Sequence, residues 1–292
     1  FGLVGARDEY GASFTPPHSG LYWYWFTFDT ADGPHFCARG YGGRSEVLDS
    51  MGDRYQLTVY DPAYQPPRWF GEGITYNIFP DRFCRDREPV QPEGEGIAPR
   101  VLHENWDDLP VYRPDEHGEI LNNDFFGGTL RGVMEKLDYL ESLHVQTIYF
   151  NPIFQAYSNH RYDTGDYKRI DPLLGSEEDF KTLCEQAKKR GMRVVLDGVF
   201  NHTGYDSRYF NGHGRYDSLG AHQSKDSPYY PWFDFSEWPD KYGSWWGIYT
   251  LPQVNEHNED YQNYIFRDAD SVVRRWLRLG ASGWRLDVAD EL

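Results

Sequence analysis

Apolar and polar positions divide the sequence into two parts of different periodicity. Residues 1–65 hold short runs of aromatic and β-branched residues, such as 21–26 and 55–60, and show no helical period. Gly and Pro clusters separate these runs, and Pro66-Pro67 follows them. Such runs between turn residues are typical of strands. We therefore predict an all-β, sandwich-like module over residues 1–67, and we expect it to be truncated at its start.

From about residue 68, strand-like runs alternate with apolar stripes of helical spacing. The strand-like runs are 74–79, 144–150, 194–199 and 284–288. The stripes lie at about 130–140, 180–187 and 260–279, and a capping box (Ser176 to Asp179) precedes the second. Repeated strand–helix units predict a parallel sheet in an α/β fold. Right-handed crossovers could close this sheet as a barrel or leave it open, and periodicity leaves both alternatives.

Two long stretches, about 81–126 and 203–257, show little periodicity. Loops of this length are uncommon unless they are functional or disordered. Polar clusters follow the second, third and fourth strand-like runs, at the strand ends where a barrel carries its chemistry. No Gly-rich phosphate loop follows any of these runs, which weighs against nucleotide binding.

Composition excludes several classes of partner. The formal net charge of −17 argues against nucleic acid and against an anionic membrane surface as partners. No run of about 18 apolar residues predicts a membrane span. Aromatic residues make up 17% of the chain, which suits a groove that stacks sugar rings. Three cysteines do not suggest a disulfide framework, and no signal peptide is visible, so the compartment stays open with the cytoplasm slightly favoured.

Candidate chemistry begins at the last strand-like run. Arg285 stands two places before Asp287, which puts both side chains on one face of a strand. A guanidinium beside a carboxylate keeps it ionised and oriented, as a carboxylate nucleophile requires. The preceding run ends in Asp197, Asn201 and His202. Alone, that cluster fits a capped turn equally well; paired with the Arg–Asp motif, it favours an active site.

Four segments together resemble signatures of the α-amylase superfamily, glycoside hydrolase family 13, and they occur in its order. They are 158–167, 194–202, 251–255 and 283–291. The Leu-Pro-x-x-Asn form of 251–255 and the acidic Glu291 are similar to the neopullulanase- and cyclomaltodextrinase-like subgroup. This resemblance implies that 68–292 form the first half of a catalytic (β/α)8 TIM barrel, with 203–257 inserted after strand three. An N-terminal β-sandwich is common in that subgroup and fits the first module.

The resemblance also implies residue roles. Asp287 would be the catalytic nucleophile, and Arg285 would orient it. Tyr162 would stack under the sugar that is cleaved, and His202 would hydrogen-bond that sugar. Asp163 is either a substrate-binding residue or a partner of nearby backbone, and both remain open. The expected supporting residues, which fix the geometry of the site, are Asp197 and Asn201.

The implied reaction is retaining hydrolysis of α-1,4-glucosidic bonds in maltodextrin, cyclodextrin or pullulan. In that family the acid, a Glu, follows strand five, so we expect this chain to be an N-terminal fragment that is inactive alone. No cofactor is expected, and no metal ligand is assigned. Calcium is in doubt because Glu291 replaces a histidine of the usual site. The expected partner is an α-glucan, a second copy of the chain is kept as a candidate, and the alternative function is non-catalytic carbohydrate binding or interaction.

Overall fold

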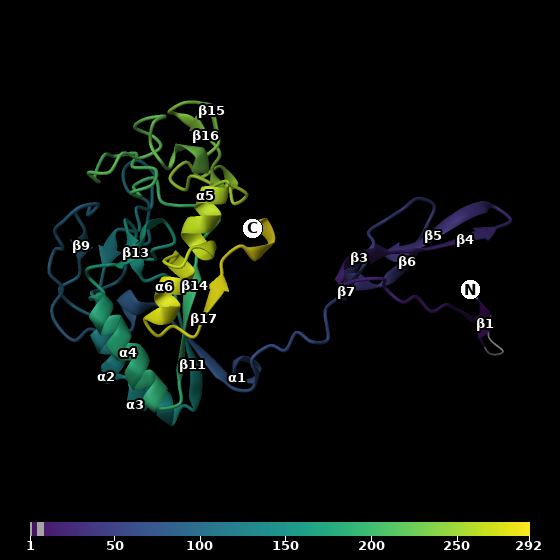
Figure 1. Ribbon diagram of the computed structural model, residues 1–292, viewed down its shortest axis with the longest axis horizontal. Helices are drawn as coiled ribbons and strands as arrows, with labels where there is room; N and C mark the ends of the chain where they lie inside the picture. Colours follow the sequence, from purple (N-terminus) through teal and green to yellow (C-terminus); the bar gives the residue numbers. More distant parts are fainter. Residues whose placement is uncertain (1, 5–8) are drawn as a thin grey trace. The chain divides into compact units, whose positions relative to one another are not determined.

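A computed structural model describes residues 2–4 and 9–292 of the chain. The chain divides into two compact units, residues 1–67 and residues 68–292 (Figure 1). All three cysteines are free thiols. Among the described residues, no helix is both long enough and apolar enough to cross a membrane.

The first unit consists of short antiparallel strands. β3 (Gly20–Tyr24) pairs with β7 (Tyr55–Val59), and β1 (Gly2–Val4) pairs with β2 (Glu9–Gly11). A third sheet contains β4 (Phe26–Thr30), β5 (Gly33–Arg39) and β6 (Ser45–Leu48). The run 21–26, predicted as one strand, is divided at Trp25, because the chain leaves the β3–β7 sheet there for the β4–β6 sheet. Stacking of these sheets into a sandwich stays a prediction.

Four parallel strands form the central sheet of the second unit. Their order across the sheet is β17 (Gly283–Leu286), β14 (Arg193–Gly198), β11 (Val145–Phe150) and β8 (Ile74–Ile78). Each strand therefore lies beside the strand that precedes or follows it in the repeated strand–helix pattern. The fold of this unit is therefore α/β, and its sheet resembles part of a (β/α)8 barrel.

Helices cover this sheet with the predicted apolar faces. α4 (Glu177–Lys189) begins at the capping box, in which Ser176 and Asp179 each accept a backbone N–H of the other. The stripes that begin at Leu130 and Phe180 are buried, except that Met134 in the first stripe is only partly buried. Trp276 is also fully buried, and its ring packs against Phe180 with a centroid separation of 5.3 Å. The helical periodicity therefore identified the core side of each helix correctly.

Two helices predicted as continuous are interrupted. The stripe at 130–140 forms α2 (Leu130–Glu135) and α3 (Leu137–Ser142), which meet at the non-helical Lys136. The stretch 260–279 forms α5 (Glu259–Gln262), a π-helical turn (Asn263–Arg267) and α6 (Val272–Arg278). The backbone of Asp268 is extended and ends the π-helical turn. Apolar spacing continued across both breaks, so the pattern could not reveal them.

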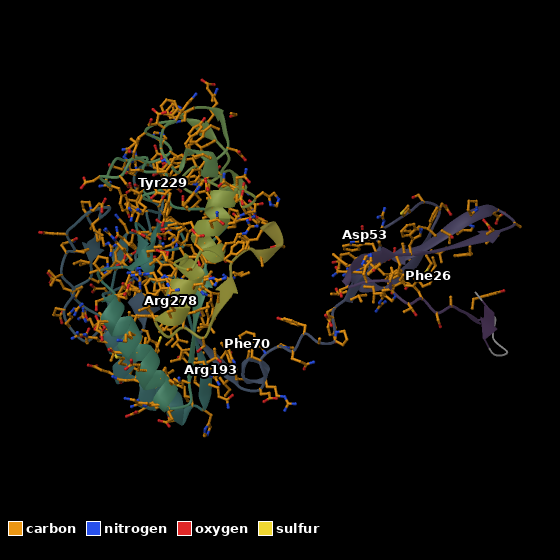
Figure 2. All side chains as sticks on the ribbon, in the orientation of Figure 1. Phe26, Asp53, Phe70, Arg193, Tyr229 and Arg278 are labelled. Atoms are coloured by element: carbon orange, nitrogen blue, oxygen red, sulfur yellow. The ribbon has the colours of Figure 1, made fainter. Side chains whose placement is uncertain are left out.

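The opposite end of the sheet is covered by a short helix, α1 (Arg68–Gly71). The guanidinium of Arg193, at the start of β14, lies 4.9 Å from the ring centre of Trp69. Phe70 packs edge-on against the same indole, at 5.8 Å between centroids (Figure 2). This end carries cation–π and aromatic packing, whereas the predicted site residues lie at the other end of the strands.

The long connections contain short pairs of strands. β9 (Val101–Leu102) pairs with β10 (Asp124–Phe125), β12 (Phe154–Ala156) with β13 (Thr164–Ile170), and β15 (Phe235–Glu237) with β16 (Lys241–Tyr242). The segment 203–257 is mostly irregular but has an aromatic core of its own. In this core Tyr229 (Figure 2) packs edge-on against Tyr209 and Trp232, with centroid separations of 5.2 and 4.9 Å. This segment is called the inserted segment below.

Candidate active site

The register of the sheet places two predicted residues side by side. Asp197 on β14 and Arg285 on β17 are direct partners in the parallel pair. Arg285 Nη1 donates to Asp197 Oδ1 at 3.0 Å. Tyr149, on β11, donates its hydroxyl to Asp197 Oδ2 at 2.5 Å, and Tyr162 donates to the same oxygen at 2.9 Å. Three neighbouring strands and one loop therefore converge on one carboxylate.

Asp197 is the buried centre of this arrangement. Its side chain has no exposed surface. Burial raises the pKa of Asp197 above its ordinary value, while the hydrogen bonds from Tyr149 and Arg285 act in the opposite direction. Burial also raises the pKa of Tyr162, to about 12, so its hydroxyl keeps its proton at neutral pH and remains a donor.

Arg285 also forms an ion pair with Asp287. Strand β17 ends at Leu286, one residue before Asp287, so the prediction of a strand over 284–288 is wrong at its end. Val288 has a φ of +43°, in the left-handed region that β-branched residues rarely adopt, and it turns the chain away from the sheet. The two side chains meet because Arg285 reaches forward from the strand to the turn.

His202 is almost completely buried beside this turn. Its Nδ1 lies 3.2 Å from Asn201 Oδ1, and its ring stacks on Trp245 at 5.1 Å. Burial lowers the pKa of His202, so the imidazole is neutral at pH 7. If Nδ1 donates to this amide oxygen, Nε2 is left as an acceptor. His202 Nε2 has no hydrogen-bond partner among the described residues.

The loop before β13 carries Tyr162 and Asp163. Both carboxylate oxygens of Asp163 accept hydrogen bonds from Ser158, one from its backbone N–H at 3.0 Å and one from its hydroxyl. Of the two alternatives for Asp163, this geometry favours the partner of nearby backbone. Asn151 Nδ2 lies 3.4 Å from the Tyr162 hydroxyl, so the ring is held from a second side.

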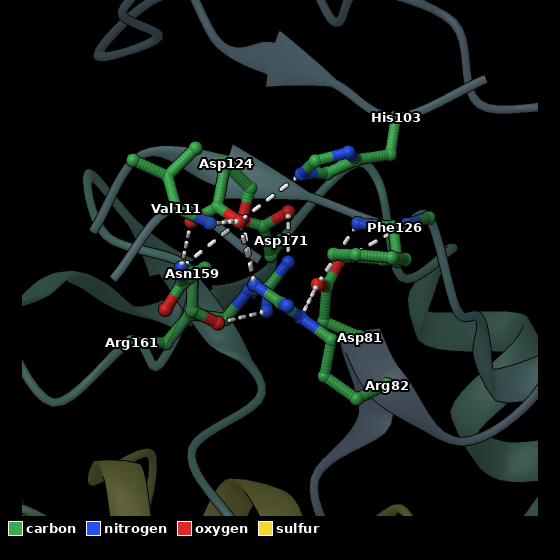
Figure 3. Close-up of polar contacts among 10 residues, drawn as sticks. Asp81, Arg82, His103, Val111, Asp124, Phe126, Asn159, Arg161 and Asp171 are labelled. Carbon is green, nitrogen blue, oxygen red and sulfur yellow. Dashed lines mark hydrogen bonds and ion pairs between the residues drawn. The ribbon is translucent and has the colours of Figure 1, made fainter. Parts of the chain in front are cut away.

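A buried cluster of ion pairs holds the loop that carries Tyr162 in place. Arg161, with a φ of +62°, donates to Asp171 Oδ1 at 3.2 Å, and Arg100 makes two contacts of 2.7 Å with Asp171. Asp124 accepts from Asn159 at 2.9 Å and anchors the neighbouring part of the loop (Figure 3). Burial would raise the pKa of Asp171, but Arg161 and Arg100 outweigh it and lower the pKa to about 2.

The exposed side of the site opens into one cavity of about 910 Å³. Four of the predicted residues line it: Tyr162, Asp163, His202 and Asp287. The other three predicted residues do not line the cavity, but each contacts at least one other predicted residue: Asp197, Asn201 and Arg285. The rest of the wall comes from 119–122, from the loop around 157–160, from Val288, and from aromatic and other residues of the inserted segment. The predicted site residues are thus brought together at one end of the sheet.

The sequence did not indicate that Glu291 and Trp245 contact each other. The Trp245 indole donates to Glu291 Oε2 at 2.9 Å, and the Trp246 indole donates to Oε1 at 3.1 Å. Trp245 also lines the cavity. The sequence left two alternatives open for Trp245 and Trp246, stacking on sugar rings and core packing, and neither residue was assigned to the site. Only their aromatic type signalled this role. Within the described residues, no cluster of His, Cys, Asp and Glu could hold a metal ion.

Residues 77–292 match the model of a protein family described as "Alpha amylase, catalytic domain". The chain belongs to the α-amylase family. This confirms the resemblance read from the four sequence segments.

Relatives in the α-amylase family include several named glucan hydrolases. The chain is 39% identical to an amylopullulanase of Thermoanaerobacter thermohydrosulfuricus, over 92% of this chain and 20% of that protein. It is 34% identical to neopullulanase 2 of Thermoactinomyces vulgaris, over 82% of this chain and 37% of that protein. Among solved structures, the cyclic α-maltosyl-(1→6)-maltose hydrolase of Arthrobacter globiformis, in complex with maltose, is 33% identical with a TM-score of 0.62. That match covers 77% of this chain and 46% of the other.

The chain thus spans less than half of each of these relatives. The family and the neopullulanase-like character are confirmed by the comparisons. The residue roles in the site remain predictions.

Proposed function

We propose that the full-length protein is a retaining glycoside hydrolase that cleaves α-1,4-glucosidic bonds in maltodextrin, cyclodextrin or pullulan. The observation that carries this proposal is the placement of Asp287, which is paired with Arg285 and lines one cavity with His202 and Tyr162. A carboxylate that is oriented by a guanidinium can attack the anomeric carbon of a bound sugar. The names of the relatives, which refer to pullulan and to a maltosyl-maltose, support this substrate class.

The other cavity residues have complementary roles in this proposal. His202 Nε2 has no hydrogen-bond partner among the described residues, and it would hydrogen-bond a hydroxyl of the bound glucosyl unit. The Tyr162 ring lines the cavity and would stack under that unit. Asp163 shapes the loop and does not contact the reacting atoms.

A retaining reaction needs a second carboxyl group about 5–5.5 Å from the nucleophile, to protonate the leaving oxygen. Glu291 does not suit this role, because each of its oxygens already accepts a hydrogen bond from an indole N–H, of Trp245 or of Trp246. We assign the acid to the part of the protein outside residues 1–292. Since a general acid typically contributes ~10²–10⁴-fold in rate, residues 1–292 alone are expected to be inactive.

The test uses the full-length protein on maltotriose, β-cyclodextrin and pullulan, with the first anomer released identified by proton NMR. Turnover with α-anomer product is expected, together with its loss in Asp287→Asn. Asp290→Asn is the matched control, because Asp290 lies in the same turn but is exposed and outside the cavity lining. Wild-type rates in Asp287→Asn, or a β-anomer product, would contradict the proposal. Glucan binding without turnover would favour the non-catalytic alternative.

A second arm assays residues 1–292 by themselves on the same substrates. No turnover is expected above the Asp287→Asn background. Turnover that disappears in Asp287→Asn would show that the acid lies within 1–292.

A further inference from the structure

Tyr149 occupies an unusual position among the groups around Asp197. Its hydroxyl donates to Asp197 Oδ2 at 2.5 Å, yet Tyr149 is not among the described residues that line the cavity. Tyr162 donates to the same oxygen but faces the cavity. Tyr149 therefore contacts the buried centre of the site without lining the cavity.

The backbone holds Tyr149 more firmly than it holds Tyr162. Tyr149 lies in β11, between β8 and β14 in the sheet. Its carbonyl oxygen accepts a hydrogen bond of 3.2 Å from Asn77 Nδ2, on β8. Tyr162 lies on a loop instead, and its ring faces the place of the proposed sugar. Of the two hydroxyls on Asp197 Oδ2, that of Tyr149 is the one fixed by the sheet.

The charge of Asp197 determines how firmly the guanidinium of Arg285 is held. The charged and titratable groups that face Asp197 are Tyr149 from β11, Tyr162 from the loop, and Arg285 from β17, with Asp287 on the far side of the guanidinium. An ionised Asp197 anchors the guanidinium of Arg285 toward the turn. A protonated Asp197 would weaken that anchor, because Oδ1 would face Arg285 without a full negative charge.

We propose that Tyr149 is a positioning residue for the nucleophile, acting through Asp197 and Arg285. Its hydroxyl holds Asp197 as an ionised anchor, the anchor fixes the guanidinium, and the guanidinium aims Asp287 at the substrate. The inference rests on the proposed function, since it takes Asp287 as the nucleophile. Burial raises the pKa of Asp197. Each hydrogen-bond donor to Asp197 acts against this effect, and so extends to lower pH the range in which Asp197 is charged.

The test is Tyr149→Phe in the full-length protein, which keeps the ring and removes only the hydroxyl. Hydrogen bonds to charged groups correspond to a loss of about tenfold or more, and we expect this loss in kcat with KM within about twofold of wild type. The acid limb of the kcat/KM profile should move to higher pH, by about one unit. Tyr209→Phe is the control, because Tyr209, in the inserted segment, is a fully buried tyrosine whose hydroxyl bonds Tyr264 of the π-helical turn, away from Asp197.

A double-mutant cycle with Asp197→Ala separates this role from general packing. Once Asp197 is absent, Tyr149→Phe should cause no further loss in kcat. An unshifted acid limb, or an equal loss in the Asp197→Ala background, would overturn the proposal. If Tyr149→Phe does not fold, fluorotyrosine at position 149 replaces it. Its more acidic hydroxyl is a stronger donor, so the acid limb should move to lower pH, and an unmoved limb overturns the proposal.

The same experiment includes Asp287→Asn, so the two proposals can fail separately. Loss of turnover in Asp287→Asn with a normal Tyr149→Phe profile would refute the positioning role alone. Full turnover in Asp287→Asn would refute the proposed function itself.

Discussion

Replacement of Asp171 by asparagine tests the buried ionic cluster that supports the Tyr162 loop. Asp171 and Arg161 have no exposed side-chain surface, and Arg100 is 2% exposed. Asp171→Asn keeps the shape of the side chain but leaves two buried guanidinium groups without their counter-charge. Removal of one partner from a buried ion pair costs about 3–5 kcal/mol of stability. A typical domain has only about 5–15 kcal/mol, so a large loss is expected.

The pKa gives a second route to this magnitude. The folded pKa of Asp171 is lowered to about 2, against ~3.9 in an unfolded chain, and the difference corresponds to roughly 2.6 kcal/mol at neutral pH. Because the folded pKa is the lower one, this stabilisation is full above the unfolded pKa and is lost as the pH falls toward 2. At pH 3 about half of it should remain. Both routes give about 3 kcal/mol near neutral pH.

The assay is urea unfolding of wild type and Asp171→Asn in the full-length protein at pH 7, 5, 4 and 3. The difference in unfolding free energy between wild type and Asp171→Asn should be constant from pH 7 to 5 and should become smaller from pH 4 to 3. Asp270→Asn is the control, because its contact with Lys168 is a 3.4 Å pair with Asp270 82% exposed, worth about 0–1 kcal/mol. The reasoning would be refuted if Asp171→Asn lost no more unfolding free energy than Asp270→Asn, or if its loss did not change with pH.

Three further changes test other parts of the structure. Ser176→Ala removes the capping box of α4 and should cost about 1 kcal/mol in urea unfolding, whereas an unchanged midpoint would contradict the cap. Trp276→Ala leaves a cavity and an unpaired Tyr167 carbonyl, so it should cost about 3–5 kcal/mol, and a loss below about 1 kcal/mol would contradict its place in the core. His202 should titrate below its ordinary pKa in nitrogen NMR spectra, because burial disfavours the imidazolium, and a pKa above 6.5 would contradict this.

Local sequence signals predicted the framework well, because they report on local physics. The capping box at Ser176 is formed by neighbours in the chain, and the strand at 194–199 has an apolar run that suits the interior of a buried sheet. The site residues follow strand ends, and the parallel register then brings Asp197 beside Arg285. Periodicity and motif order therefore indicated both the sheet and most of the candidate site.

Contacts between distant segments could not be predicted in the same way. Tyr149 reads as one more aromatic residue in a strand until the register shows that its hydroxyl meets Asp197. Glu291 and the indoles of Trp245 and Trp246 are more than 40 residues apart in sequence, and each side chain alone has many common roles. The left-handed backbone of Val288 also opposes its local preference, and only the surrounding structure imposes it.

The central claim is that Asp287 attacks the sugar and forms a covalent intermediate. The full-length protein should be incubated with an activated fluorinated maltosyl substrate that slows hydrolysis of such an intermediate, then digested and examined by mass spectrometry. A maltosyl group on the peptide that contains Asp287, absent in Asp287→Asn, is the expected result. A label on a different carboxylate, or full turnover of maltodextrin with no covalent label, would contradict the claim.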